Sequence, residues 1–473
     1  MSWLKIEEIA SNVNSGKSSA LDMVNEALKR ISNAQEFKSI ISTTEERAVE
    51  RAKDIDSLVK NGKNAGRLAG VPFIAKDNFL TYGGKTTAAS NMLKDFNAPY
   101  QATVISRLEA EGAICVAKAN LDAFAHGSST ENSDFMTTKH PTHPDRVPGG
   151  SSGGSAAAVM LDLAPFSLGT DTGGSIRLPA SFTGAVGLKP SYGLVPRYGV
   201  IAMASSTDVI GPIAKNVDDV SIVLDVIAGK DILDSTTIER EKCYNPTAPL
   251  DLKGVKVGVV KEYLEEGIDE EVKEVILGSL AKIAAAGAEI EEVSLPSLPL
   301  ALAVYYVICP AEVSSNLSRY DGIKYGHVTG TADSLQESYA KSRAEGFGDE
   351  AKRRIMIGTY VLSSGYYDAY YKKAALVRTK LINEFDNAFN KYDFLVGPTA
   401  PVTAFKAGEN IDDPLKMYLI DIMTVAANLT GIASISIPAG KAEGLPVGLQ
   451  IMANRKKDNS LLEFSKAFEE IAK

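Results

Sequence analysis

Short apolar runs alternate with helical patterns along most of this 473-residue chain. The runs typical of strands lie at 71–75, 113–117, 166–169, 254–260, 289–295, 394–396, 434–437 and 447–452. Apolar residues at helical spacing lie between them, for example at 103–111 and 270–286. Strands that alternate with helices form a mostly parallel or mixed sheet whose faces the helices cover. The order of patterns therefore predicts an α/β fold.

The patterns predict one large domain, although length alone suggests about three domains at roughly 150 residues each. We predict a single domain over residues 1–473. It would comprise N-terminal helices at 1–60, a catalytic core rich in glycine and serine at 65–230, and a helical portion with the substrate pocket at 255–473.

Charge and cysteine usage exclude several classes of protein. The 50 Lys and Arg against 59 Asp and Glu give a formal net charge of −9, whereas direct nucleic-acid binding needs clustered basic residues. Cys115, Cys243 and Cys309 are too sparse for a disulfide framework and suit a reducing compartment. We see no signal peptide and no apolar stretch near the roughly 20 residues of a membrane span. The prediction is a cytoplasmic protein without a membrane partner.

Two stretches rich in glycine and serine stand out. The first is Pro148–Ser155, which reads PGGSSGGS, and the second is Gly169–Arg177, which reads GTDTGGSIR. An apolar helical run follows the first and an apolar strand precedes the second, so neither resembles a flexible linker. Neither has the spacing of a phosphate-binding glycine loop. We therefore expect both stretches at a packed functional site.

The chemistry that fits these stretches is nucleophilic catalysis by serine. Ser175 follows a strand and offers an exposed hydroxyl. The backbone N–H groups around it can hold the oxyanion of a tetrahedral intermediate. Glycines permit this tight approach because they lack a Cβ.

A serine nucleophile also needs a base, and Lys76 is the candidate. None of the four histidines, His126, His140, His143 and His327, lies in an obvious catalytic setting. Lys76 ends an apolar run, and burial would favour its neutral form and lower its pKa. Ser151 would relay the proton between Lys76 and Ser175. The alternative for Lys76 is a solvated lysine at the end of a strand, without a catalytic role. We predict no metal site.

These residues resemble the amidase signature family, whose members use a Ser–cis-Ser–Lys triad. The resemblance implies the amidase signature fold, a central mixed β-sheet covered by helices on both faces. It implies that Ser175 is the acyl-forming nucleophile, Ser151 the bridging serine after a cis peptide bond, and Lys76 the base. The implied oxyanion loop is Thr172, Gly173 and Gly174.

Further stretches are similar to one branch of this family, the glutaminase subunits of tRNA-dependent amidotransferases. They lie at 124–133, 314–322, 352–355, 363–371 and 397–401. The resemblance implies a heterotrimer with amidotransferase subunits B and C, in which this chain supplies ammonia for a misacylated tRNA held mainly by the B component. It implies no cofactor on this chain, with ATP and Mg²⁺ on the partner. The acceptor stays open between Glu-tRNA(Gln), Asp-tRNA(Asn) or both.

Free glutamine carries a carboxylate and an ammonium group, so its site needs a fixed cation and a fixed anion. The resemblance implies that Arg354 holds the α-carboxylate, that Asp421 holds the α-amino group, and that Tyr305 lines the pocket. From the sequence alone, Arg354 could equally lie on a solvated helix face and Asp421 at the surface. His126 stands where this family usually has an apolar residue, and 139–147 and 207–209 also depart from its pattern.

Two alternatives stay open at this stage. The first keeps the triad but changes the substrate, and gives a stand-alone amidase for small aliphatic or aryl amides. The second is a non-catalytic binding subunit whose glycine-rich loops hold a ligand, against which the combination of Lys76, Ser151 and Ser175 argues.

Overall fold

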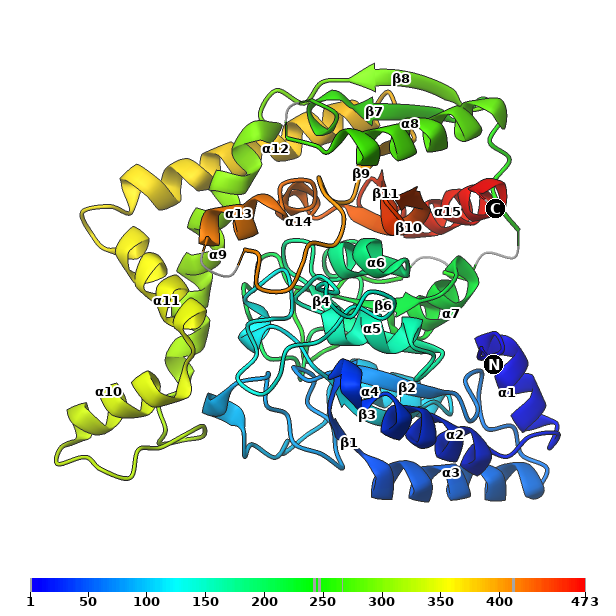
Figure 1. Cartoon of the computed structure of the whole chain (residues 1–473), viewed down its shortest axis with the longest axis vertical. Helices are drawn as coiled ribbons and strands as arrows, with labels where there is room; N and C mark the ends of the chain where they lie inside the picture. The colour runs from blue at the N-terminus through cyan, green and yellow to red at the C-terminus, as the bar shows by residue number, and fades with distance from the viewer. Residues whose placement is uncertain (1, 241–243, 246–247, 266, 411–412, 473) are drawn as a thin grey trace.

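A single mixed sheet runs through the computed structural model, which describes residues 2–240, 244–245, 248–265, 267–410 and 413–472 (Figure 1). Within these residues the strand order is β1-β3-β2-β4-β6-β5-β10-β11-β9-β7-β8. The strands are β1 (Ile40–Thr43), β2 (Pro72–Lys76), β3 (Ile114–Ala119), β4 (Phe166–Asp171), β5 (Val186–Lys189), β6 (Val209–Ala214), β7 (Lys256–Val260), β8 (Glu289–Val293), β9 (Phe394–Pro398), β10 (Ala433–Ala442) and β11 (Leu445–Ala453).

Parallel and antiparallel pairs both occur in this sheet, which confirms the predicted mixed α/β architecture. β2 pairs in parallel with β3 and β4, and β7 pairs in parallel with β8 and β9. The central strands β4, β6, β5, β10 and β11 pair antiparallel.

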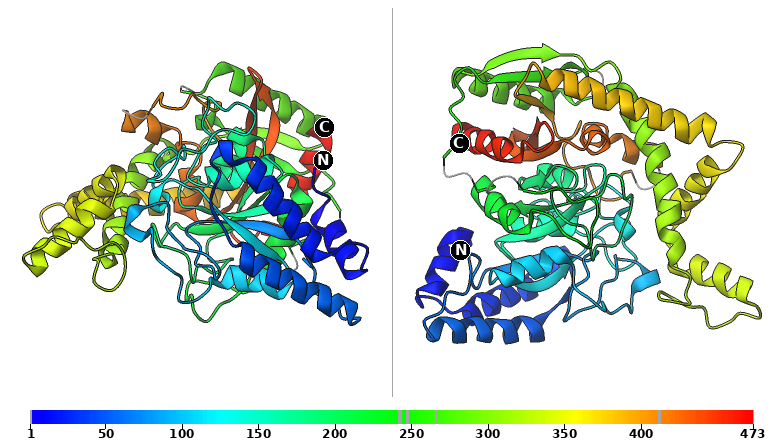
Figure 2. Two further views of the ribbon diagram at one scale, coloured as in Figure 1. Left: turned by 60° about the horizontal axis from the view of Figure 1, so that its bottom comes forward. Right: turned by 180° about the vertical axis from the view of Figure 1, so that it is seen from behind.

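Helices cover both faces of the sheet. They are α1 (Ile6–Asn14), α2 (Ala20–Asn33), α3 (Glu45–Lys60), α4 (Thr103–Ala110), α5 (Gly153–Met160), α6 (Arg177–Thr183), α7 (Val217–Ile227), α8 (Glu270–Ala285), α9 (Ala301–Asn316), α10 (Leu335–Gly346), α11 (Asp349–Leu362), α12 (Lys373–Phe389), α13 (Pro414–Leu419), α14 (Val425–Thr430) and α15 (Asp458–Ala472). From behind, Figure 2 shows α1 to α3 at one end of the sheet and α8 and α12 at the other.

The alternation of side chains along the strands separates two packed layers. Phe73 and Ala75 on β2 belong to the core beneath α4 and α7, whereas Ile74 belongs to the core beneath α2 and α3. With a period of two residues, Lys76 shares the face of Ile74. It therefore points to the layer that also contains α5, which packs against β2.

Most predicted elements are present, but three strands were missed. β1 and β5 have only four residues each, and β6 contains Gly211 and Pro212. Glycine and proline inside a run usually indicate a break rather than a strand. Ser19 is the N-cap of α2, because its side chain accepts from the Asp22 N–H.

The expectation that no apolar stretch approaches the length of a membrane span was wrong. Among the described residues, the helical run Leu298–Arg319 is long and apolar enough to cross a membrane by length and composition alone. Half of its most apolar window is buried inside the molecule. Val304, Ile308 and Val313 lie in a core shared with α12 and α14, so packing against other helices accounts for its composition.

Candidate active site

Lys76 is the last residue of β2 and is fully buried. Its Nζ lies 2.8 Å from Ser151 Oγ, 2.9 Å from Ser152 Oγ and 2.9 Å from Thr170 Oγ1. None of the described carboxylates forms an ion pair with it. Burial lowers the pKa of Lys76 to about 7, against the opposing charges of nearby aspartates. A substantial fraction of Lys76 is therefore neutral near pH 7 and able to accept a proton.

The two glycine–serine stretches lie against each other beside this lysine. Ser151 follows a cis peptide bond with Gly150, and the Ser152 N–H donates to the Ser175 carbonyl at 3.1 Å. Ser175 itself is half-buried. No hydrogen bond joins the Ser151 and Ser175 hydroxyls in the part of the chain that the structure describes, so the proton relay between them stays a prediction.

The loop that follows β4 offers unused N–H groups. The N–H groups of Thr172, Gly173, Gly174 and Ser175 donate to no acceptor within the described residues. Gly174 has a φ of 143°, and a Cβ added there would lie 2.2 Å from Thr424 Oγ1. The loop thus turns too tightly for a side chain and presents several donors around Ser175, as an oxyanion hole requires.

A buried ion pair between Asp171 and Arg177 holds this loop in place. Asp171 accepts from the Ile176 N–H at 3.1 Å and pairs with Arg177 at 2.9 Å. Arg177 also donates to Gln450 and Asn428, at 2.6 Å each. Burial alone would raise the pKa of Asp171, but the Arg177 charge lowers it to about 2. The carboxylate stays ionised and holds both ends of the turn that carries Ser175.

The residues expected to bind glutamine are buried rather than solvated. Arg354 on α11 is 3% exposed, and its Nε donates to Glu350 Oε1 at 2.8 Å. Its guanidinium carbon lies 5.6 Å and 5.7 Å from the ring centres of Tyr306 and Tyr418. These contacts give a cation held against aromatic faces.

A carboxylate and a tyrosine complete this side of the site. Asp421 is 8% exposed, and its Oδ2 accepts from Ser128 Oγ at 2.9 Å. Burial raises the pKa of Asp421 to about 7. Tyr305 covers the oxyanion loop, since a Cβ on Gly173 would lie 2.7 Å from its Cζ.

A cavity of about 430 Å³ lies beside these groups, and Ser128, Arg354 and Tyr418 line it. Asp122 also lines it, and its N–H donates to the Ser151 carbonyl at 3.3 Å. Burial raises the pKa of Asp122 to about 6. A buried cation therefore lines one side of the cavity, and a residue that is hydrogen-bonded to the glycine–serine stretch lines another.

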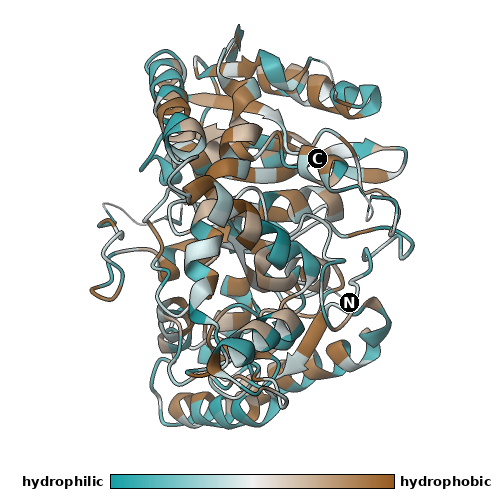
Figure 3. Cartoon of the chain, turned by 90° about the vertical axis from the view of Figure 1, so that its left-hand side faces the viewer, coloured by the Kyte–Doolittle hydropathy of each residue, from teal (hydrophilic) through white to brown (hydrophobic). Residues whose placement is uncertain are grey.

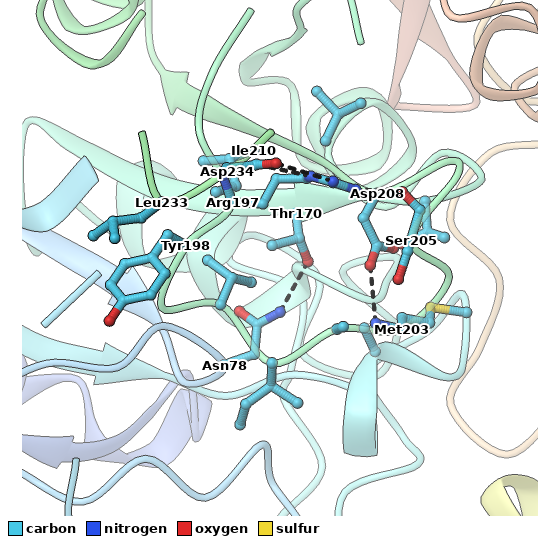
Figure 4. A pocket seen from close by; sticks show the side chains of 16 residues that line it. Asn78, Thr170, Arg197, Tyr198, Met203, Ser205, Asp208, Ile210, Leu233 and Asp234 are labelled. Atoms are coloured by element: carbon cyan, nitrogen blue, oxygen red, sulfur yellow. Dashed lines mark hydrogen bonds and ion pairs between the residues drawn. The ribbon is translucent and has the colours of Figure 1, made fainter. Parts of the chain in front are cut away.

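A second, smaller cavity of about 200 Å³ adjoins the other side of the same cluster (Figure 4). Thr170 lines it, as does Asn78, whose Nδ2 donates to Thr170 Oγ1 at 3.1 Å. Asp208 accepts from Thr172 Oγ1 at 2.7 Å and thereby supports the oxyanion loop from this cavity.

Several of these contacts were missed by sequence reasoning. Ser152 and Thr170 contact Lys76, and Ser128 contacts Asp421. Ser152 lies within the glycine–serine stretch, and Thr170 lies near the end of the strand before the nucleophile loop. The motifs could therefore have indicated both residues as part of the site. Ser128 carried a signal only through its place in the stretch 124–133.

The structure also bears on other reactive groups. Cys115 and Cys309 are free and buried, whereas Cys243 lies outside the described residues. Among the residues that are described, no three His, Cys, Asp or Glu side chains gather where they could hold a metal ion.

Comparison with known proteins identifies the family. A model of the amidase family matches residues 22–462. The chain belongs to this family. The A component of the glutamyl-tRNA(Gln) amidotransferase of Thermoanaerobacter pseudethanolicus is 51% identical over 472 residues, which cover 99% of this chain and 96% of that protein.

Solved structures of amidases share the fold over nearly the whole chain. The crystal structure of the A component of the glutamyl-tRNA(Gln) amidotransferase of Thermotoga maritima matches with a TM-score of 0.82 and 40% identity, and covers 99% of this chain and 94% of that one. The peptide amidase from Stenotrophomonas maltophilia matches with a TM-score of 0.83 and 27% identity, over 98% of this chain and 96% of that one.

Proposed function

We propose that this amidase hydrolyses glutamine and supplies the ammonia to a tRNA-dependent amidotransferase. One observation carries the proposal: a buried lysine without a carboxylate partner among the described residues contacts two serines beside a loop of unused N–H groups. Such a lysine can act as a base near neutral pH, and the loop can hold an oxyanion.

The charges around the larger cavity favour glutamine over a simple amide. Arg354 suits the α-carboxylate, and Asp421 suits the α-amino group. Both side chains are almost completely buried, where a charge is costly unless it is paired. Arg354 is already paired with Glu350, and a substrate that carries both charges would add a second partner for Arg354 and a cationic partner for Asp421.

The site residues perform the reaction in two steps. Neutral Lys76 accepts a proton through Ser151 as Ser175 Oγ attacks the carboxamide carbon, and the N–H groups of 172–175 hold the oxyanion. The C–N bond then breaks, the returning proton leaves with ammonia, and a glutamyl ester remains on Ser175. Water, deprotonated through the same pair, cleaves the ester and releases glutamate.

We propose that the partners are amidotransferase subunits B and C, and that ATP, Mg²⁺ and most tRNA contacts belong to the partner. The full-length similarity to the A components of two glutamyl-tRNA(Gln) amidotransferases supports this assignment. The net charge of −9 agrees with tRNA contacts made mainly elsewhere.

An exposed apolar face supports an assembly of several subunits. The ring centres of Tyr360, near the end of α11, and Tyr366, in the turn after it, lie 4.2 Å apart, next to Tyr370. Met356 is 66% exposed and Leu376 65%. These helices extend away from the sheet in Figure 1, and Figure 3 faces that side and shows hydrophobic residues on outward helices. Exposed apolar surface of this kind is typical of binding faces.

The test is coexpression with candidate subunits B and C, followed by glutaminase assays with and without ATP and misacylated tRNA. We expect turnover that depends on the partner, and loss of at least about 10⁴-fold in Ser175→Ala. Retained activity in that variant would overturn the mechanism. Robust hydrolysis of small amides by the isolated chain, without a stable partner, would favour the stand-alone amidase instead.

A further inference from the structure

His126 is a buried side chain at the larger cavity that the proposed mechanism does not use. It lines the cavity with Ser128 and Arg354, and its exposed fraction is 0%. Its backbone is held firmly, because its N–H donates to the Ala123 carbonyl at 3.0 Å and its carbonyl accepts from Asn132 Nδ2 at 2.7 Å. The backbone therefore fixes the point from which the side chain extends at the cavity.

Both ring nitrogens of His126 are unsatisfied. Neither Nδ1 nor Nε2 has a hydrogen-bond partner among the described residues, although both are buried. A buried polar atom without a partner costs free energy, and such atoms are uncommon in folded proteins. An unsatisfied donor that lines a ligand cavity points to a partner on the ligand.

The surroundings decide what that ligand group is. Burial lowers the pKa of His126, and the nearby Arg354 charge lowers it further. The ring is thus neutral, with one N–H donor and one acceptor nitrogen. Next to a guanidinium, an anionic ligand group is favoured, and a neutral N–H can donate to it without repelling the arginine.

Strain in the backbone just before His126 also indicates a binding site. Phe124 and Ala125 both have positive φ values, of 52° and 64°. Two consecutive non-glycine residues in this region are unfavourable, and such strain clusters at binding and catalytic sites. This turn brings the imidazole, rather than the Phe124 ring, to the cavity that Arg354 lines.

We propose that His126 is a substrate-binding residue that donates a hydrogen bond to the carboxylate of the amide substrate, beside Arg354. The inference rests on the proposed function only in taking that carboxylate to be the α-carboxylate of glutamine. The charged Arg354 and the neutral His126 would together recognise the carboxylate of the amide substrate.

The test compares His126→Met, which removes the donor at similar volume, with the wild type in the complete complex. The KM for glutamine should rise about tenfold, equivalent to about 1.4 kcal/mol, with kcat changed less than about twofold. His126→Gln, which keeps an N–H donor, should recover part of the loss. His327→Met is the matched control, because His327 does not line this cavity. Its Nε2 lies 2.7 Å from Glu345 Oε2 instead.

A neutral amide separates recognition from general damage. For butyramide, which has no carboxylate, kcat/KM should be the same in the wild type and in His126→Met. An unchanged KM for glutamine, or an equal loss on both substrates, would overturn the inference. As a second readout, ¹⁵N-histidine spectra of Ser175→Ala should show the His126 ring signals shift when glutamine is added, and the absence of a shift would count against it.

The outcomes also separate this inference from the proposed function. If the wild type cleaved glutaramate but not glutamine, the proposed function would fail, and a dependence of the glutaramate KM on His126 would still support the inference. If the glutaramate KM did not depend on His126, the inference would fail alone. Turnover of neither carboxylate-bearing amide would overturn both.

Discussion

Two buried lysines at the ends of adjacent strands have opposite surroundings. Lys76 ends β2, and Lys118 lies near the end of β3, paired in register with Ala75. Both are fully buried. Lys118 Nζ lies 2.8 Å from the carboxylate of Asp77 and donates to the Phe79 carbonyl, also at 2.8 Å. Lys76 contacts only hydroxyls among the described residues.

The carboxylate nearest to Lys76 in the sequence is engaged elsewhere. Asp77 accepts from the Thr87 N–H at 2.9 Å and pairs with Lys118. Lys118 is held in an ion pair with Asp77 and serves structure, whereas Lys76, which has no carboxylate partner among the described residues, can lose its proton and serve chemistry. Placement of a single aspartate thus decides which lysine can act as a base.

The largest effect on turnover is expected for Lys76→Met. Without the base, kcat should fall by about 10³–10⁴-fold, while the thermal midpoint should stay equal or rise, because a costly buried amine is replaced by an apolar side chain. Steady-state assays and thermal unfolding measure the two effects. Loss of stability together with activity would show that Lys76 is structural like Lys118.

A carboxylate introduced beside Lys76 should make its surroundings similar to those of Lys118, which has a carboxylate partner. In Ser152→Asp, the new charge would raise the pKa of Lys76, and each unit of increase lowers its neutral fraction about tenfold. We expect kcat/KM at pH 7 to fall by about 100-fold, as two such units would give, and to recover in part at higher pH. Ser152→Asn controls for shape without charge, and recovery with pH should be missing there.

The pH profile of the wild type should report the unpaired lysine. With a pKa of about 7 for Lys76, kcat/KM should rise about tenfold between pH 6 and pH 8, because the deprotonated form is active. Stability should change in the same sense. The folded pKa lies below the unfolded value near 10.5, so the unfolded chain binds more protons and stability increases from about pH 7 to pH 10. A flat rate profile over this range would contradict Lys76 as the base.

The smallest effect on turnover is expected for Lys118→Met. It leaves Asp77 as an uncompensated buried charge, so the free energy of unfolding should fall by about 3–5 kcal/mol. The kcat of the folded protein should change less than about threefold. Denaturant unfolding measures the loss, and Asp77→Asn in the same chain should restore part of it. A large drop in kcat with normal stability would remove the distinction between the lysines.

Local patterns in the sequence were sufficient to predict which segments lie together at the proposed catalytic site. Lys76 ends β2 and Ser175 follows β4, and backbone geometry brings the ends of such adjacent parallel strands together at one edge of a sheet, whereas Ser151 lies just before α5. The engagement of Asp77 with Lys118 was not predictable, because it depends on the register between β2 and β3.

The substrate half depended on the family resemblance instead. Arg354 on α11 and Asp421 in the turn between α13 and α14 belong to separate segments that carry no catalytic motif, and polarity alone indicates the surface for both. The stacked rings of Tyr306 on α9 and Tyr418 on α13 have their centres 4.0 Å apart. A contact of this kind leaves no periodic pattern in the sequence. The strand β6 was missed for a related reason, since its neighbours rather than its composition stabilise it.

The bonds from Arg177 to Asn428 and Gln450 have a consequence for the order of assembly. Residues that lie more than 250 positions further along the chain fix the loop that carries Ser175. During synthesis, the N-terminal strands can pair early, but the nucleophile loop gains its last supports only after β11 has left the ribosome. A growing chain would therefore hold all three triad residues well before it could cleave an amide, which delays hydrolysis until the whole sheet has closed.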